Sequence, residues 1–133
     1  MINDEKGFRR TVCRILDSAG AHYSMVESPE TSPGIPDLNW CLNGREGWSE
    51  LKYSGNGHLP HMRPLQIQWI RRRVAAGGNV SVITYHRPMN MVLVLPGRDI
   101  ESIKSMVHLV ELSGHITVEE LGKLFLNNSL MEH

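Results

Sequence analysis

Three residues that could carry out hydrolytic chemistry stand close together in the middle of the sequence. Asp37 follows a glycine–proline turn, and Glu50 and Lys52 are separated by a single residue. Because alternate residues of a strand share a face, Glu50 and Lys52 would project together. Two carboxylates with open positions beside them suit Mg²⁺ or Mn²⁺, which keep several waters when they bind protein. Such a cation could activate a water against a phosphodiester, with Lys52 neutralising the charge that develops on the phosphate.

The pattern around these residues predicts that two paired strands position them. Residues 37–42 and 48–54 read as strands, and the Asn43-Gly44 sequence between them is typical of a hairpin turn. A hairpin would bring Asp37, at the start of the first strand, close to the Glu50 carboxylate on the second. The three side chains are therefore expected to converge on one point.

Two predicted helices add polar candidates to this point. Residues 4–19 have apolar residues at helical spacing, and Glu5 falls on the same side as these residues. The helix over residues 64–76 begins with a proline and ends before two glycines, and Gln66 lies within its apolar arc. An inward carboxylate or amide needs polar partners or a metal. Alternatively, Glu5 stays solvated in the first helical turn, and Gln66 is a satisfied core residue.

The remaining pattern predicts an α/β protein. Residues 79–85 and 90–95 read as strands, and two further helices are expected to begin near Gly97 and at Thr117. The order is therefore helix, hairpin, helix, two strands and two helices. This order predicts a mixed central β-sheet flanked by helices.

The motifs resemble those of a known family. The GIPD sequence at residues 34–37, followed after twelve residues by ELK at 50–52, resembles the motif of the PD-(D/E)xK nucleases. The segment 63–78 is similar to the glutamine-bearing helix of the VRR-NUC branch, which includes small phage-type nucleases and is close to the archaeal Holliday junction resolvases. The resemblance covers residues 4–95. It implies a restriction-endonuclease-like αβββαβ core with a C-terminal helical extension.

The resemblance also implies roles for single residues. Asp37 and Glu50 match the metal ligands, and the backbone carbonyl of Leu51 is implied as a third ligand for Mg²⁺ or Mn²⁺. Lys52 matches the catalytic lysine, and Gln66 matches the motif glutamine. The implied catalytic set is therefore two acids, one lysine and one amide.

One family position differs in this chain. The first helix of the resolvases usually carries a glutamate where Arg9 stands here. Glu5 lies one turn earlier on nearly the same helix face. Either Glu5 takes that place and serves as a further metal ligand, or this ligand is absent from the chain.

The charge distribution divides the chain. The formal net charge is 0, but residues 1–98 hold 12 Lys and Arg against 8 Asp and Glu, while residues 99–133 hold 2 against 6. This asymmetry predicts a basic working domain over 1–98, which the resemblance implies is the nuclease domain, and an acidic helical extension over 99–133 for packing or dimerisation. Solvated helix faces would also explain the basic residues, and Arg73 could lie along apolar surface. The residues expected to contact DNA phosphates are Arg9, Arg10, Arg14, His61, Arg63, Arg71, Arg72 and Arg73.

These features together predict a metal-dependent DNA endonuclease. The resemblance implies a homodimer acting on branched DNA such as a Holliday junction, with other structured or linear duplex DNA as an alternative. A non-catalytic nucleic-acid-binding or assembly domain that keeps the fold also remains open. Cys13 and Cys41 lack metal-type spacing, and no signal-peptide-like or membrane-length apolar run is present. The expected location is the cytoplasm. If the protein is phage-encoded, this is the cytoplasm of the host cell.

Overall fold

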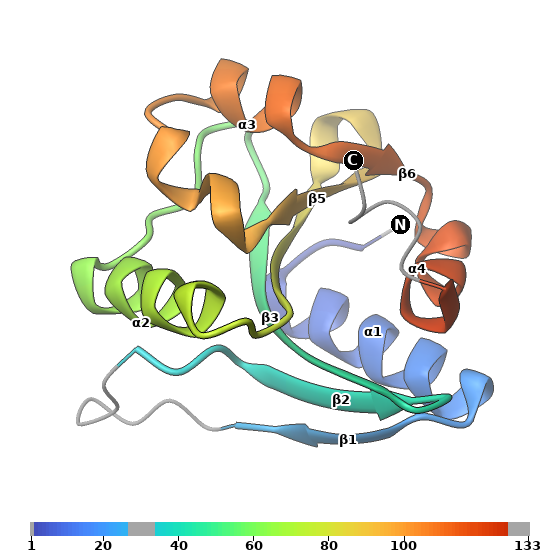
Figure 1. The fold of residues 1–133 in the computed structure, drawn as a ribbon. Coiled ribbons are helices and arrows are strands. Elements are labelled where there is room, and N and C mark those ends of the chain that lie inside the picture. The colour runs from blue at the N-terminus through green and yellow to red at the C-terminus, as the bar shows by residue number, and fades with distance from the viewer. Residues whose placement is uncertain (1, 27–33, 128–133) are drawn as a thin grey trace.

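A six-stranded mixed sheet forms the centre of the protein (Figure 1). The structure is a computed structural model that describes residues 2–26 and 34–127. The strands lie in the sheet in chain order, and neighbouring pairs are antiparallel except β3 and β4, which are parallel. The predicted α/β class with a mixed sheet is confirmed. The strands are β1 (His22–Met25), β2 (Leu38–Leu42), β3 (Arg45–Ser54), β4 (Val80–His86), β5 (Met91–Pro96) and β6 (Gly114–Ile116).

Helices cover both faces of this sheet. In Figure 1, α1 and α4 lie on one side of β3, whereas α2 lies on the other side together with the segment that contains α3. No helix in the described part of the chain has the length and apolar character needed to span a membrane. The α-helices are α1 (Glu5–Ala19), α2 (Pro64–Ala75), α3 (Met106–Leu112) and α4 (Leu121–Asn127). Short 3-10 helices are η1 (Arg87–Met89), η2 (Gly97–Ser102) and η3 (Val118–Glu120).

Two hydrophobic clusters follow from the alternation of side chains along the strands. Leu51 and Ile83 point toward α1 and pack with Phe8. Val82 is adjacent to Ile83 in β4, so its side chain points to the opposite face of the sheet, toward α2, where it packs with Ile70. Both faces of the central strands are thus buried, which is the usual condition of a parallel strand pair.

Local signals fix the ends of the two long helices. The Asp4 side chain accepts a 2.7 Å hydrogen bond from the Gly7 backbone N–H at the start of α1. Gly20 ends α1 in the left-handed region at φ 82°, a conformation that glycine adopts without a steric cost. Pro64 occupies the first turn of α2, where its missing N–H leaves no hydrogen bond unmade.

The chain beyond residue 98 joins the same fold. The sequence pattern predicts only helices there, but the structure also contains β6, which pairs antiparallel with β5. Ile116, Leu121 and Phe125 complete the cluster on the α1 face. The residue pattern also gives no strand at β1, although the αβββαβ core implied by the resemblance includes one there. Both strands have four residues or fewer, so neither is long enough to show a clear period of two.

Candidate active site

The site lies at the start of β2, where β2 and β3 separate, and we call this point the β2–β3 fork. The β2–β3 ladder stops at the pair Leu38 and Ser49. One step beyond it, the Leu51 backbone N–H donates a 3.0 Å hydrogen bond to Oδ2 of Asp37. The Asp37 backbone N–H in turn donates a 3.2 Å hydrogen bond to Oε1 of Glu50. Side-chain carboxylates therefore replace the missing strand pairing and lie buried beside each other, with Asp37 7% and Glu50 3% exposed.

Gln66 holds the other oxygen of Glu50. Its Nε2 donates a 2.9 Å hydrogen bond to Oε2 of Glu50. Its Oε1 accepts from the Arg63 backbone N–H at 2.9 Å and from Nζ of Lys52 at 3.4 Å. The donors and acceptors around it settle the orientation of the amide. Gln66 thus occupies the inward position that the sequence predicts, and it also satisfies a backbone group at the start of α2.

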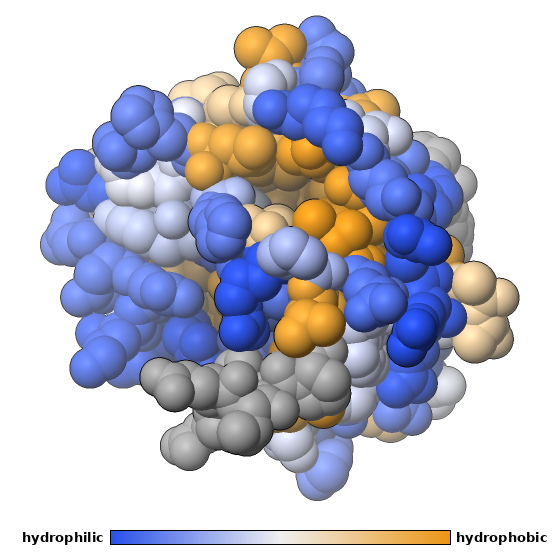
Figure 2. Space-filling model, turned by 90° about the vertical axis from the view of Figure 1, so that its left-hand side faces the viewer, coloured by the Kyte–Doolittle hydropathy of each residue, from blue (hydrophilic) through white to orange (hydrophobic). Residues whose placement is uncertain are grey.

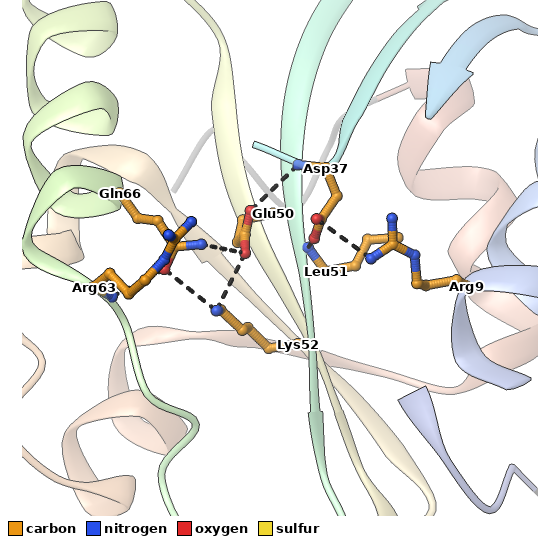
Figure 3. A network of polar contacts seen from close by, with 7 residues as sticks. All are labelled: Arg9, Asp37, Glu50, Leu51, Lys52, Arg63 and Gln66. Carbon is orange, nitrogen blue, oxygen red and sulfur yellow. Dashed lines mark hydrogen bonds and ion pairs between the residues drawn. The ribbon is translucent and has the colours of Figure 1, made fainter. Parts of the chain in front are cut away.

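Lys52 lies between the carboxylate and the amide (Figure 3). Its Nζ is 3.2 Å from Oε2 of Glu50. Lys52 and Glu50 project from the same face of β3, as their spacing predicts. The structure therefore brings together the four side chains of Asp37, Glu50, Lys52 and Gln66.

Arg9 approaches Asp37 from the opposite side of the sheet. Figure 3 shows Arg9 reaching from α1 toward Asp37, whereas Gln66 and Lys52 lie on the other side of Glu50. Nη1 of Arg9 is 3.4 Å from Oδ1 of Asp37. Arg9 is one of the residues expected to contact DNA phosphates, and no pattern in the sequence predicts this ion pair.

Glu5 does not join the group, which corrects one expectation. The helical pattern placed Glu5 on the core-facing side, but it is exposed in the first turn of α1. An acid in that turn interacts favourably with the helix dipole and stays in water. Within the described ranges, no three His, Cys, Asp or Glu side chains are placed to share a metal ion. Asp37 and Glu50 are the two acids that the fork brings together.

Burial and charge make Glu50 hard to ionise. Burial away from solvent is the larger cause and the negative charge of Asp37 the second, and together they raise the pKa of Glu50 to about 7. The positive charge of Lys52 opposes this shift. A divalent cation between the two carboxylates would offset their repulsion. The Leu51 carbonyl points to the same edge as its N–H, because both groups of a strand residue face one side. The site therefore offers two carboxylates and a backbone oxygen, a donor set that fits Mg²⁺ or Mn²⁺.

The turn before Asp37 packs directly on α2. Gly34 has φ 86°, and a Cβ atom added there would lie 2.2 Å from the Leu65 carbonyl oxygen. Only glycine permits both this conformation and this close approach. Contact between the turn and the first turn of α2 thus fixes Asp37 relative to Gln66.

The other basic residues expected to contact DNA lie on several different segments of the fold. His61 and Arg63 belong to the segment that leads into α2, while Arg10 and Arg14 are exposed along α1. Nε of Arg71 is 3.3 Å from Oε1 of Glu101, in a pair about 60% exposed on both sides.

Arg72 and Arg73 are exposed near the end of α2. The Arg73 guanidinium lies 4.8 Å from the centre of the Trp69 ring and 5.7 Å from that of Trp48. This placement fits the alternative that Arg73 lies along apolar surface.

The fold is shared with a known nuclease. The chain superimposes on the 1.6 Å structure of Archaeoglobus fulgidus Hjc, a Holliday junction resolvase from an archaeal hyperthermophile, with a TM-score of 0.64. The match covers 88% of this chain and 98% of that chain, at 16% sequence identity. No protein-family profile and no curated protein match the sequence. The resemblance read from residues 34–78 is thus confirmed at the level of the fold.

Proposed function

We propose that this protein is a metal-dependent nuclease that hydrolyses phosphodiester bonds in DNA. The observation that carries the proposal is the buried network at the β2–β3 fork, in which Asp37, Glu50, Lys52 and Gln66 meet within hydrogen-bonding distance. A buried pair of acids with a lysine has little use in stabilising a fold, because burying charges is costly. Perturbed ionisable groups of this kind are typical of catalytic sites.

The residues would divide the chemistry as follows. Asp37, Glu50 and the Leu51 carbonyl would hold Mg²⁺ or Mn²⁺, which polarises a phosphoryl oxygen and lowers the pKa of an attacking water. Lys52 would orient that water or neutralise charge on the phosphate. Gln66 would fix the positions of Glu50 and Lys52 through the hydrogen bonds that it makes to both.

Substitution of Lys52 tests this proposal. Lys52→Ala should abolish Mg²⁺- or Mn²⁺-dependent cleavage because it removes the positive charge nearest Glu50, while DNA binding in Ca²⁺ should persist. Cleavage would be followed on gels with a four-way junction, a flap and linear duplex, with EDTA as a blank. Lys104→Ala, an exposed lysine outside the site, is the matched control and should cleave normally. Normal cleavage by Lys52→Ala would remove the assignment.

We further propose that the preferred substrate is branched DNA and that the protein acts as a homodimer. The support is the fold shared with a protein described as a Holliday junction resolvase. Resolution of a four-way junction requires a cut in two of its four strands, and a twofold-symmetric dimer presents two equivalent sites. The substrate panel and a sedimentation measurement with and without junction DNA test the two parts separately.

A non-catalytic DNA-binding domain is the second candidate. The Arg9 guanidinium beside Asp37 favours it, because a cation already neutralises one of the two acids. Calorimetric titration with Mn²⁺ distinguishes the candidates. Binding of the metal at Asp37 and Glu50, lost in Asp37→Asn, supports the nuclease. DNA binding without any metal binding supports the second candidate.

A further inference from the structure

A pocket of about 310 Å³ opens directly beside Lys52. Lys52 and Thr84 are neighbours in the register of β3 and β4, so the pocket floor extends the row of side chains that carries Glu50. Ile67 of α2 and Leu109 of α3 belong to its walls. Figure 2 faces this side of the molecule and shows apolar side chains gathered round a hollow.

One buried polar side chain, that of Thr84, belongs to the lining of this pocket, most of whose residues are apolar. Thr84 is 1% exposed, and its hydroxyl has no hydrogen-bond partner among the described residues. Leaving a buried hydroxyl unpaired costs free energy, so native proteins rarely do it. Apolar walls with a few placed polar groups are the usual construction of a site for a small organic group.

The chemistry of the walls and mouth limits what the pocket can accept. The volume is at the low end of the range of about 300–1,000 Å³ for ligand pockets, which suits one heterocycle. The walls favour a largely apolar surface, and the Thr84 hydroxyl requires a hydrogen-bonding edge. Lys52 lines the pocket, and His61 also contributes to it, so an attached anionic group would meet positive charge at Lys52. A nucleobase attached to its phosphodiester has all of these properties.

Building on the proposed hydrolysis of DNA, we propose that this pocket receives one nucleobase of the strand bound at Lys52, withdrawn from the base stack. The Thr84 hydroxyl would form a hydrogen bond with the edge of that base. Unstacking is least costly for bases that are unpaired or lie at a branch point. The pocket would therefore favour branched or distorted DNA over regular duplex.

Two pairs of variants separate the parts of this proposal. Thr84→Val removes the hydroxyl and keeps the shape of the side chain, whereas Thr84→Ser keeps the hydroxyl. Ile103→Phe adds bulk at the pocket wall. Val107→Phe introduces the same phenylalanine side chain on α3, at a position that is 62% exposed and does not line the pocket.

The decisive measurement is the fluorescence of 2-aminopurine placed in turn at each nucleotide next to the branch point of a four-way junction. Unstacking brightens this base. With Ca²⁺ to prevent hydrolysis, the wild type should brighten one position, and Thr84→Ser and Val107→Phe should do the same. Thr84→Val and Ile103→Phe should reduce the brightened population by about threefold to tenfold, as expected for loss of a hydrogen bond or of space.

An abasic site at the brightened position provides the second measurement. Without a base to accommodate, Ile103→Phe should bind the junction as tightly as the wild type. Equal weakening with the abasic and the intact junction would show a general structural defect and would overturn the proposal.

The outcomes separate this inference from the proposed nuclease activity. Cleavage by the wild type with no brightened position overturns the base pocket and leaves the activity standing. Brightening that Ile103→Phe removes, without cleavage in Mg²⁺ or Mn²⁺, supports the pocket and overturns the activity. Failure to bind any DNA overturns both.

Discussion

Glu50 carries its charge in an unfavourable environment, because its side chain is buried and Asp37 lies beside it. These two causes raise the pKa of Glu50 to about 7 from a usual value of 4.5. Between these values the unfolded chain releases a proton that the folded protein retains. The folded state without metal therefore loses stability as the pH rises from about 4.5 to 7, and the effect is constant above that range.

Glu50→Gln tests whether Glu50 causes this pH dependence of stability. The amide has no proton to release, so the variant should show a smaller loss of stability between pH 5 and pH 8. The difference in unfolding free energy should reach about 3 kcal/mol at most. Urea unfolding in EDTA at several pH values measures it, and parallel curves for the two proteins would contradict it. In the wild type, protons compete with the metal at Glu50, so Mn²⁺ affinity should rise as the pH increases toward about 7 and should level off above it.

The sequence locates the central site residues because their spacing is local. A two-residue period predicts that Glu50 and Lys52 share a face, and a hairpin predicts that Asp37 lies near them. The structure agrees with both expectations. Glu5 was misplaced because helical spacing gives the side of a helix and not the part of the helix that meets the sheet.

The unpartnered Thr84 hydroxyl shows another limit of local patterns. Thr84 sits in β4, a strand that is buried along its whole length and has other polar residues, so its type gives no sign of function. Its importance comes from the register that places it beside Lys52. That register joins strands separated by α2, and no short-range pattern encodes it.

At the scale of elements, the site depends on contact between the turn before β2 and the start of α2. Gly34→Ala would place a Cβ atom 2.2 Å from the Leu65 carbonyl oxygen and would also strain the left-handed backbone. We expect a loss of stability well above the roughly 1 kcal/mol of the backbone strain alone. Because the turn carries Asp37, metal affinity should fall as well.

Gly44→Ala is the matched control for this prediction. Gly44 also has a positive φ, of 77°, but nothing lies within 4 Å of the added Cβ atom. Its variant should lose only the backbone contribution and should bind Mn²⁺ normally. Thermal unfolding and Mn²⁺ titration of both variants make the comparison, and equal losses would show that packing on α2 is unimportant.

At the scale of the whole molecule, the two parts of the chain carry opposite charge but share one fold. Residues 99–127 supply a strand and buried side chains to the sheet that positions the site. We propose that the division at residue 98 is electrostatic, with DNA on the basic part and the acidic part turned away from it. The short elements after residue 98 were the least predictable, because their order depends on packing against the rest.

The charge balance predicts that metal strengthens DNA binding. Residues 1–98 carry a formal charge of +4, from 12 basic and 8 acidic residues. A divalent cation at Asp37 and Glu50 would raise this to about +6. Junction DNA should therefore bind more tightly in Ca²⁺ than in EDTA at equal ionic strength, as measured by fluorescence anisotropy. Equal affinity in the two buffers would contradict the prediction.

Gln66 makes hydrogen bonds both to the backbone before α2 and to Glu50, so opening of the site can be followed without substrate. Its Oε1 accepts a hydrogen bond from the Arg63 backbone N–H, while its Nε2 donates one to Glu50. A movement that carries the whole Gln66 side chain away from Glu50 would break both hydrogen bonds and would open that backbone N–H to exchange with solvent. The hydrogen-exchange rate of the Arg63 backbone amide therefore reports how often the contact between Gln66 and Glu50 opens. The measurement requires neither substrate nor catalysis.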